Sequence, residues 1–266
     1  MSDNIITTQP WKMGDCIELM QELDDESIDM VFADPPFNVG KNYGCETDDN
    51  RSDYFDWCGQ WIKECFRVLK PTGSFYHMNI VRNLSNLMPI MDRYGTLRNL
   101  IVWKNVCSWG SKKQFYFKYQ PIMFYSKTDD FKFNTYAQRE KPFKRWGSMS
   151  GKMQGQMGDM WLDIPFVWAG STHHPEAILE HGTNSKVHPT QMPVKLVERA
   201  ILFSTEEGDN VLDPFLGIGT TLEAGRITNR NVIGFDINPQ WEKYYPDRCK
   251  IHTPPLQSYF GNGELD

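Results

Sequence analysis

The chain has 266 residues, of which 40% are hydrophobic and 23% are charged, and its formal net charge is −6. This length and composition are typical of a globular protein with one large domain or two small ones, and no apolar run is long enough to span a membrane. The first residues, Met1 to Asn4, lack the charged and apolar regions of a signal peptide, so we expect a cytoplasmic protein.

Apolar periodicity predicts helices and strands that alternate along much of the chain, the pattern of an α/β fold. Helices are expected over 17–23, 53–69, 82–93, 194–203 and 220–227. Strands are expected over 27–33, 74–78, 97–103, 119–126, 210–213 and 232–237, with 119–126 antiparallel at the sheet edge. Pro71-Thr72-Gly73 is expected to end the second helix, and Asp15 stands where a cap of the first helix belongs.

A short motif, Asp34-Pro35-Pro36-Phe37, directly follows the apolar strand 27–33. Two prolines stop a strand, because neither can donate a hydrogen bond to a neighbour and the second holds the first in an extended conformation. The motif therefore presents a carboxylate, backbone carbonyls and an aromatic ring at the carboxyl end of a strand, where open α/β sheets bind ligands. A strand-terminating turn with Asp34 as a cap would explain the same residues.

The middle of the chain differs in charge and in regularity. Residues 98–152 hold twelve Lys or Arg against three acids, a local charge of +9 in an acidic protein, with aromatic residues interleaved. Such a segment is typical of a face that contacts phosphates, although a solvated surface has the same composition. Residues 127–187 lose the regular pattern and are interpreted as an insertion, and the polar loop 38–51 has little to bury and is expected to be mobile.

A glycine-containing loop, 214–221, joins the strand 210–213 to a helix, and the next strand ends at Asp236, 17 residues after Gly219. Glycines let the backbone approach a ligand, a helix N-terminus offers free amides, and an acid at the second strand's end suits ribose hydroxyls. The loop lacks the third glycine of the dinucleotide fingerprint, which disfavours a nucleotide-dependent oxidoreductase. A glycine-rich structural turn is the alternative.

Neither disulfides nor a metal site is expected. The six cysteines show no Cys-x-x-Cys pair or other zinc spacing, so reduced thiols are favoured. The histidines at 173, 174 and 181 have no ligand spacing around them.

Three motifs together resemble the amino-methylating DNA methyltransferases: Asp34-Pro35-Pro36-Phe37-Asn38, His188-Pro189-Thr190-Gln191-Met192-Pro193, and 213–221. Their order, with the catalytic motif before the cofactor loop, is similar to the circularly permuted β group of that family. The resemblance covers nearly the whole chain and weakens only in 127–187, where the family places its target-recognition region. Two residues depart from the family pattern: Ile218 stands where a small Ser is usual, and Met192 where Lys is usual.

The resemblance implies a Rossmann-like S-adenosylmethionine-dependent methyltransferase fold with a seven-stranded, mostly parallel sheet and an antiparallel edge strand. Residues 1–126 would form the catalytic half, 127–187 the target-recognition insertion and 188–266 the cofactor-binding half. The implied catalytic residues are Asp34, Pro35, Pro36 and Phe37. The implied cofactor-binding residues are Asp15, Cys16, Asp34, Thr190, Asp213, Phe215, Gly217, Gly219, Thr220 and Asp236.

The implied reaction is methylation of an exocyclic amine on a base flipped out of double-stranded DNA. The Asp34 carboxylate and the Pro35 carbonyl would accept hydrogen bonds from the amine and turn its lone pair toward the methyl donor, while Phe37 would stack on the base. Asp at the first motif position resembles the adenine-N6 enzymes, whereas Ser is commoner in cytosine-N4 enzymes. Two further functions stay open at this point: a catalytically silent nucleic-acid-binding subunit and an RNA methyltransferase.

Candidate DNA contacts are Asn38, Tyr43, Lys141, Lys144, Arg145 and Lys152. Solvated charges would explain the basic residues almost as well. The resemblance also associates the chain with restriction–modification enzymes and with homodimers, although no stretch of the sequence demonstrates an interface.

Overall fold

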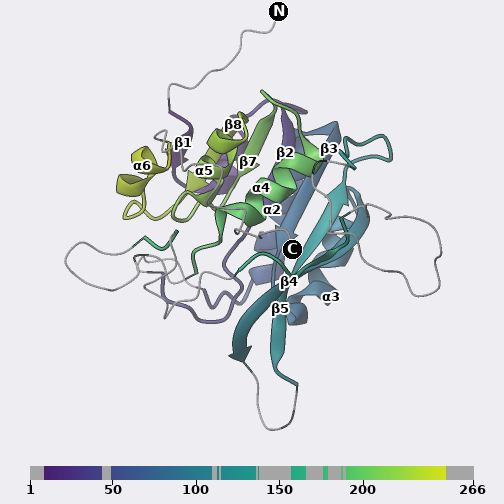
Figure 1. The fold of residues 1–266 in the computed structure, drawn as a ribbon, viewed down its shortest axis with the longest axis vertical. Helices are drawn as coiled ribbons and strands as arrows, with labels where there is room; N and C mark the ends of the chain where they lie inside the picture. The colour runs from purple at the N-terminus through teal and green to yellow at the C-terminus, as the bar shows by residue number, and fades with distance from the viewer. Residues whose placement is uncertain are drawn as a thin grey trace, which may run out of the picture.

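The computed structural model describes residues 9–43, 49–109, 113, 115–135, 137, 157–165, 176–178, 187 and 190–249. The elements, in chain order, are β1 (Trp11–Met13), α1 (Cys16–Met20), β2 (Ile28–Ala33), α2 (Tyr54–Val68), β3 (Leu69–Met78), α3 (Val81–Met91), β4 (Thr96–Trp109), β5 (Phe117–Ser126), β6 (Met160–Trp161), α4 (Val194–Ser204), β7 (Asn210–Asp213), α5 (Thr220–Ile227), β8 (Asn231–Asp236), a 3₁₀ turn (Glu242–Tyr244) and α6 (Tyr245–Cys249). They form an α/β fold in which helices lie on both faces of one sheet (Figure 1).

The sheet has eight strands in the order β1-β8-β7-β2-β3-β5-β4-β6. Strands β1, β8, β7, β2 and β3 pair in parallel, and β5 runs antiparallel to both of its neighbours. The chain order reverses between β7 and β2, so the crevice at their carboxyl ends is the topological switch point of the sheet. The mostly parallel α/β architecture is confirmed.

Two details of the predicted sheet were wrong. The strand 119–126 was expected at the sheet edge, but β5 lies between β3 and β4. The connection through α3 places β4 two positions from β3, and β5 then returns antiparallel to fill the position between them. The sheet also has an eighth strand, because β6 in the insertion pairs with Val102 and Trp103 of β4. A two-residue strand has no periodicity from which it could be predicted.

The second helix ends earlier than expected, and the turn at 71–73 is absent. Helix α2 stops at Val68, and β3 begins at once at Leu69 and runs through Pro71. The register between β2 and β3 is shifted between Ile28 and Met30, so this end of β3 departs from regular pairing. Proline is tolerated there because a strand end or irregularity does not need every backbone amide.

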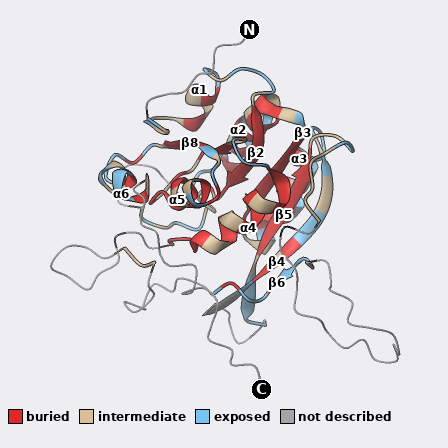
Figure 2. Ribbon diagram, turned by 45° about the horizontal axis from the view of Figure 1, so that its top comes forward, coloured by how far each residue is buried: buried red, intermediate tan, exposed pale blue. Residues whose placement is uncertain are grey.

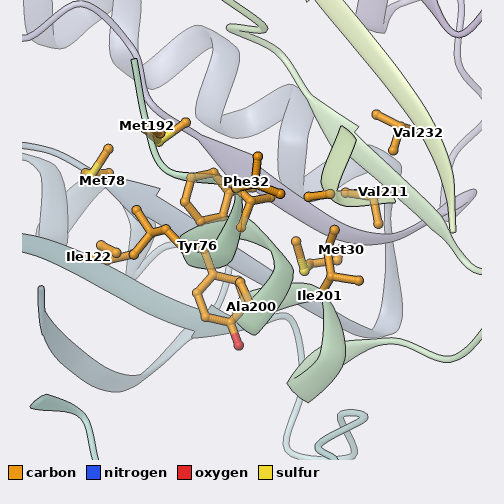
Figure 3. Packing of buried hydrophobic residues seen from close by; sticks show 14 of the residues in the cluster. Met30, Phe32, Tyr76, Met78, Ile122, Met192, Ala200, Ile201, Val211 and Val232 are labelled. Carbon is orange, nitrogen blue, oxygen red and sulfur yellow. The ribbon is translucent and has the colours of Figure 1, made fainter. Parts of the chain in front are cut away.

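Strand β2 is buried along its whole length (Figure 2). Its residues belong to two hydrophobic clusters, one on each face of the sheet. Met30 and Phe32 join the cluster beneath α4 and α5, which Figure 3 shows around Tyr76, Ala200 and Ile201. Val31 and Ala33 join the opposite cluster beneath α1, α2 and α3. This alternation is the period of two that a strand imposes, and burial on both faces explains why residues 30–33 are all apolar.

In the part of the chain that the structure describes, no helix is long and apolar enough to cross a membrane. The same residues contain no cluster of three or more His, Cys, Asp or Glu side chains that could hold a metal ion.

Two helical glycines give opposite expectations for stability. A Cβ on Gly225 in α5 would lie 2.0 Å from Val232 Cγ2, so Gly225→Ala should lower the free energy of unfolding by about 1–3 kcal/mol through overpacking. The matched change in α2, Gly59→Ala, meets only Ile90 Cγ2 at 4.0 Å and should raise it by about 0.5–1 kcal/mol, because alanine favours helix. Urea unfolding of both variants measures the difference, and a neutral Gly225→Ala would contradict the close α5–β8 packing.

Candidate active site

The carboxyl ends of β2, β7 and β8 surround one cavity of about 270 Å³. Most of the predicted site residues line it: Asp15, Cys16, Asp34, Pro35, Pro36, Phe37, Asn38, Tyr43, Thr190, Phe215, Gly217, Thr220 and Asp236. Asp213 and Gly219 do not line it. Lys141, Lys144, Arg145 and Lys152 lie outside the described residues, as do His188 and Pro189.

The carboxylate of Asp34 has one oxygen that is buried without a hydrogen-bond partner among the described residues. The residue is partly buried at the end of β2, and its Oδ1 atom has neither accessible surface nor a hydrogen-bond partner among the described residues. Burial raises the pKa of this carboxyl well above its ordinary value, the negative charge of Asp213 raises it further, and Lys41 opposes both effects. A buried acceptor without a partner is costly, and such costs are typical of functional sites.

The described part of the polar loop, residues 38–43 and 49–51, is held by hydrogen bonds, although the sequence predicted a mobile loop; residues 44–48 lie outside the described residues. The buried Asp49 side chain accepts hydrogen bonds from the backbone amides of Asn38 (2.7 Å), Val39 (3.2 Å) and Lys41 (2.8 Å). The amide of Gly40 donates to the Asp49 carbonyl at 2.8 Å. Composition alone suggested a solvated loop because a single internal acceptor such as Asp49 leaves no periodic signal.

The same loop also contacts the segment that follows β8, two positions from β2 in the sheet. The Asn238 side chain, just after β8, donates a hydrogen bond to the Tyr43 carbonyl at 3.0 Å. Asn38 and Tyr43 both line the cavity, and hydrogen bonds from Asn38 to Asp49 and from Asn238 to Tyr43 hold their backbone in place. Burial raises the pKa of the Tyr43 hydroxyl, and the charges of Asp34 and Asp49 raise it further.

The glycine loop is shaped by Asp213, which lies beneath it. One carboxylate oxygen of Asp213 accepts from the Phe215 amide at 2.9 Å, and the other accepts from the Thr221 hydroxyl. Burial raises the pKa of Asp213 to about 7. Gly219 begins α5 at φ +82°, a conformation that favours glycine, and the hydroxyl of Tyr245 donates to the Gly217 carbonyl at 2.9 Å. Asp213 and Gly219 thus contribute to the conformation of the loop without lining the cavity.

Asp236 joins the glycine loop to the adjacent strand end. Its Oδ2 accepts from the Gly217 amide and its Oδ1 from the Asn238 amide, each at 2.7 Å. Each oxygen keeps a second lone pair, and the residue lines the cavity. Burial raises the pKa of Asp236 to about 6.

Residues from three further segments close the cavity. Asp15 caps α1 by accepting from the Ile17 amide at 2.8 Å, as its position predicted, and buried Cys16 follows it. The Thr220 hydroxyl donates to the Met192 carbonyl at 3.2 Å, which holds the segment of Thr190 against α5. The two residues that depart from the family pattern, Met192 and Ile218, are both buried in the core and also line the cavity.

Sequence reasoning did not select several cavity-lining residues: Lys41, Asp49, Arg51, Tyr54, Trp57, Asn238 and Trp241. Tyr54 and Trp57 lie on α2, where no motif marked them, and the others lie in irregular segments. Only tertiary structure brings these segments together. Four acids, Asp15, Asp34, Asp49 and Asp236, line the cavity against two bases, Lys41 and Arg51, so the lining is acidic on balance.

Comparison with known proteins places this site in a family. The sequence profile described as DNA methylase, N6_N4_Mtase, matches residues 28–245. The Type II methyltransferase M.BamHI of Bacillus amyloliquefaciens is 34% identical over 84% of this chain, which spans 53% of that protein. The DNA adenine methyltransferase YhdJ of Escherichia coli K12 is 34% identical over 86% of this chain and is covered over 79% of its own length.

Solved structures share the fold at low sequence identity. A cytosine-N4-specific enzyme, the PvuII DNA methyltransferase, superposes with a TM-score of 0.65 at 20% identity, over 93% of this chain and 89% of its own. TTHA0409 of Thermus thermophilus, solved in complex with S-adenosyl-L-methionine, has a TM-score of 0.61 at 20% identity, over 93% of this chain and 96% of its own. The profile match and the identity to YhdJ show that the chain belongs to the family of N6-adenine and N4-cytosine DNA methylases.

Proposed function

We propose that this protein is a DNA methyltransferase that transfers a methyl group from S-adenosylmethionine to the N6 amine of an adenine extruded from duplex DNA. One observation carries the proposal. The family motif places the Asp34 carboxylate, with its buried and unpartnered Oδ1, on the same cavity as the glycine loop and Asp236. An acceptor for an amine and a site for a nucleoside therefore share one enclosure.

The residues present fit S-adenosylmethionine. Asp236 keeps lone pairs for ribose hydroxyls, and the backbone of Gly217 lies close to the cavity because no side chain intervenes. The acidic lining suits a ligand with a sulfonium and an ammonium group, and it disfavours the diphosphate of a nicotinamide cofactor. When bound, S-adenosylmethionine supplies an electrophilic methyl group.

The chemistry of the chain's own residues is positioning. The lone pair of an exocyclic amine is delocalised into the base, which makes the amine a poor nucleophile. Hydrogen bonds from the amine to the Asp34 carboxylate and the Pro35 carbonyl favour a pyramidal nitrogen whose lone pair is free to react. Phe37, which is half-buried against the core, offers a ring on which the extruded base stacks.

Adenine is proposed over cytosine on two grounds: Asp34 at the first motif position resembles the adenine enzymes, and YhdJ is a DNA adenine methyltransferase. We assign target recognition to residues 127–187, between the catalytic half, 1–126, and the cofactor-binding half, 188–266. Within that segment, Asp163 pairs with Arg199 of α4, with N–O distances of 2.6 and 2.8 Å. The insertion is thus attached to the helix that follows the Thr190 segment.

The test of this function uses tritiated S-adenosylmethionine and unmethylated genomic DNA. After the incubation, the DNA is digested and its nucleosides are separated by chromatography. We expect the label in N6-methyladenine. Label in N4-methylcytosine would overturn the base assignment and keep the reaction, whereas no label in DNA despite cofactor binding would overturn DNA methylation.

Replacing Asp34 should separate catalysis from cofactor binding. Asp34→Ala removes the acceptor and should lower the methyl-transfer rate by roughly 100- to 1000-fold, while affinity for S-adenosylmethionine stays close to wild type. Asp34→Asn keeps one neutral oxygen acceptor and should retain an intermediate rate. Single-turnover kinetics and calorimetric titration with the cofactor measure the two effects. Loss of fold and cofactor affinity together with activity would count against a catalytic role.

The methyl-transfer rate should rise with pH as Asp34 loses its proton. Its pKa is raised by burial and by Asp213, and the ionised carboxylate is a stronger acceptor for the amine than the neutral acid. Lys41 lowers this pKa, so Lys41→Met should move the rise to higher pH, whereas the exposed Lys63→Met on α2 should not. Single-turnover rates with saturating DNA across pH measure the midpoint. Superimposable profiles for wild type and Lys41→Met would refute this account.

A further inference from the structure

The carbonyl groups that follow Pro35 are held by buried side chains. The Tyr54 hydroxyl donates to the Pro36 carbonyl at 2.8 Å, and Asn83 Nδ2 donates to the Phe37 carbonyl at 2.9 Å. Tyr54 is 2% exposed and Asn83 is 6% exposed. None of the hydrogen bonds within the described part of the chain ends on the Pro35 carbonyl.

A third side chain, Asn79, joins the two donors. It directly follows β3 and is fully buried. Its Nδ2 donates to the Tyr54 oxygen at 3.1 Å, and its Oδ1 accepts from Asn83 Nδ2 at 2.9 Å. Asn79, which follows the neighbouring strand β3, therefore positions the two side chains that bind the motif after β2.

The direction of each bond follows from what each group can do. A carbonyl only accepts, so the single Tyr54 proton points to Pro36 and the Tyr54 oxygen must accept from Asn79. This orients the Asn79 amide, whose oxygen also accepts from the backbone amide of Ile80 at 2.9 Å. A backbone amide only donates, so two independent contacts give the same orientation. Each of the groups is satisfied, and a satisfied buried network is rigid.

His77 provides the last acceptor of the network. Its Nε2 lies 3.4 Å from Asn79 Nδ2, and its Nδ1 lies 3.4 Å from the Met91 sulfur. Burial lowers the pKa of His77 to about 3, so the ring is neutral and Nε2 is able to accept from Asn79. Both hydrogens of the Asn79 amide group therefore have partners.

Pro36 links the restrained Pro36 carbonyl to the Pro35 carbonyl. The peptide planes on either side of Pro36 differ only by its φ and ψ angles, and the pyrrolidine ring locks φ near −65°. The Tyr54 bond at the Pro36 carbonyl restrains the second angle. With both angles restrained, the direction of the Pro35 carbonyl is set by the position of Tyr54.

We infer that Tyr54 and Asn79 are positioning residues for methyl transfer, which hold the Pro35 carbonyl as the second acceptor for the target amine. This inference rests on the proposed function. Neither residue needs to touch the amine. A misplacement of about 1 Å at a reacting group costs roughly 100-fold in rate, so a small displacement of this carbonyl has a measurable effect.

Tyr54→Phe tests the inference, because it removes the hydroxyl and keeps the ring that packs against Phe55 and Trp57. With tritiated S-adenosylmethionine and unmethylated genomic DNA, we expect kcat to fall by roughly 10- to 100-fold. The KM for DNA and the Kd for the cofactor should stay close to wild type. A purely structural loss would instead change binding and kcat together.

The matched control is Tyr76→Phe, which removes a fully buried hydroxyl bonded to Ser204 at 2.7 Å, away from the cavity. It should cost comparable thermal stability and leave kcat unchanged. Asn83→Ala, in the first turn of α3, keeps the Tyr54 bond and should give a smaller fall in kcat. If Tyr54→Phe does not fold, Asn83→Ala decides the outcome on the same kcat and KM measurements.

The results separate this inference from the function on which it rests. If wild type methylates DNA and Tyr54→Phe, or Asn83→Ala in its place, keeps the wild-type kcat, the inference is overturned and the function stands. A fall in kcat that Tyr76→Phe reproduces, or that follows lost cofactor affinity, also overturns it. If wild type binds the cofactor but labels no DNA, both the function and the inference are overturned.

Discussion

The parallel pairing of β2 with β7 is the constraint on which the site depends. Met30 and Val31 of β2 lie beside Val211 and Leu212 of β7, although about 180 residues separate them in sequence. Because both strands run in the same direction, both end at the same edge of the sheet. The acidic motif after one and the glycine loop after the other are thereby placed on a single cavity. Burial of β2 on both faces stabilises this register, since a slip by one residue would exchange its two hydrophobic clusters.

The cavity concentrates carboxylates in a place where they are poorly solvated. Burial raises the pKa of Asp34, Asp213 and Asp236, and the first two also repel each other. Asp213 and Asp236 offset part of this cost by accepting backbone or hydroxyl hydrogen bonds, whereas Asp34 leaves Oδ1 unpartnered. A cationic ligand would relieve the repulsion, and an amine would satisfy Asp34. Perturbed acids of this kind cluster at functional sites because unliganded stability and function compete there.

The Asp34-Pro35-Pro36-Phe37 motif and the loop after it are held by side chains that belong to no recognised sequence motif. Tyr54 and Asn83 donate to the Pro36 and Phe37 carbonyls, and Asn79 hydrogen-bonds to both of these side chains. Asp49 accepts from the backbone amides that come next. Backbone acceptors of this kind are useful only when their directions are fixed, because a carbonyl that rotates freely contributes little to orientation. The rigidity of the motif thus arises partly from its prolines and partly from neighbours on α2, β3 and α3.

The amino-acid sequence by itself determined the α/β class, most helices and strands, and the motifs at their ends, because apolar periodicity and proline or glycine breaks are local signals. Strand 210–213 and helix 220–227 agree with the structure residue for residue. Tertiary structure alone decided that β5 lies inside the sheet, that Asp213 and Gly219 do not line the cavity, and that Asp49 binds the backbone of a polar loop. Each of these depends on contacts between distant segments, and such contacts leave no periodic trace in a single sequence.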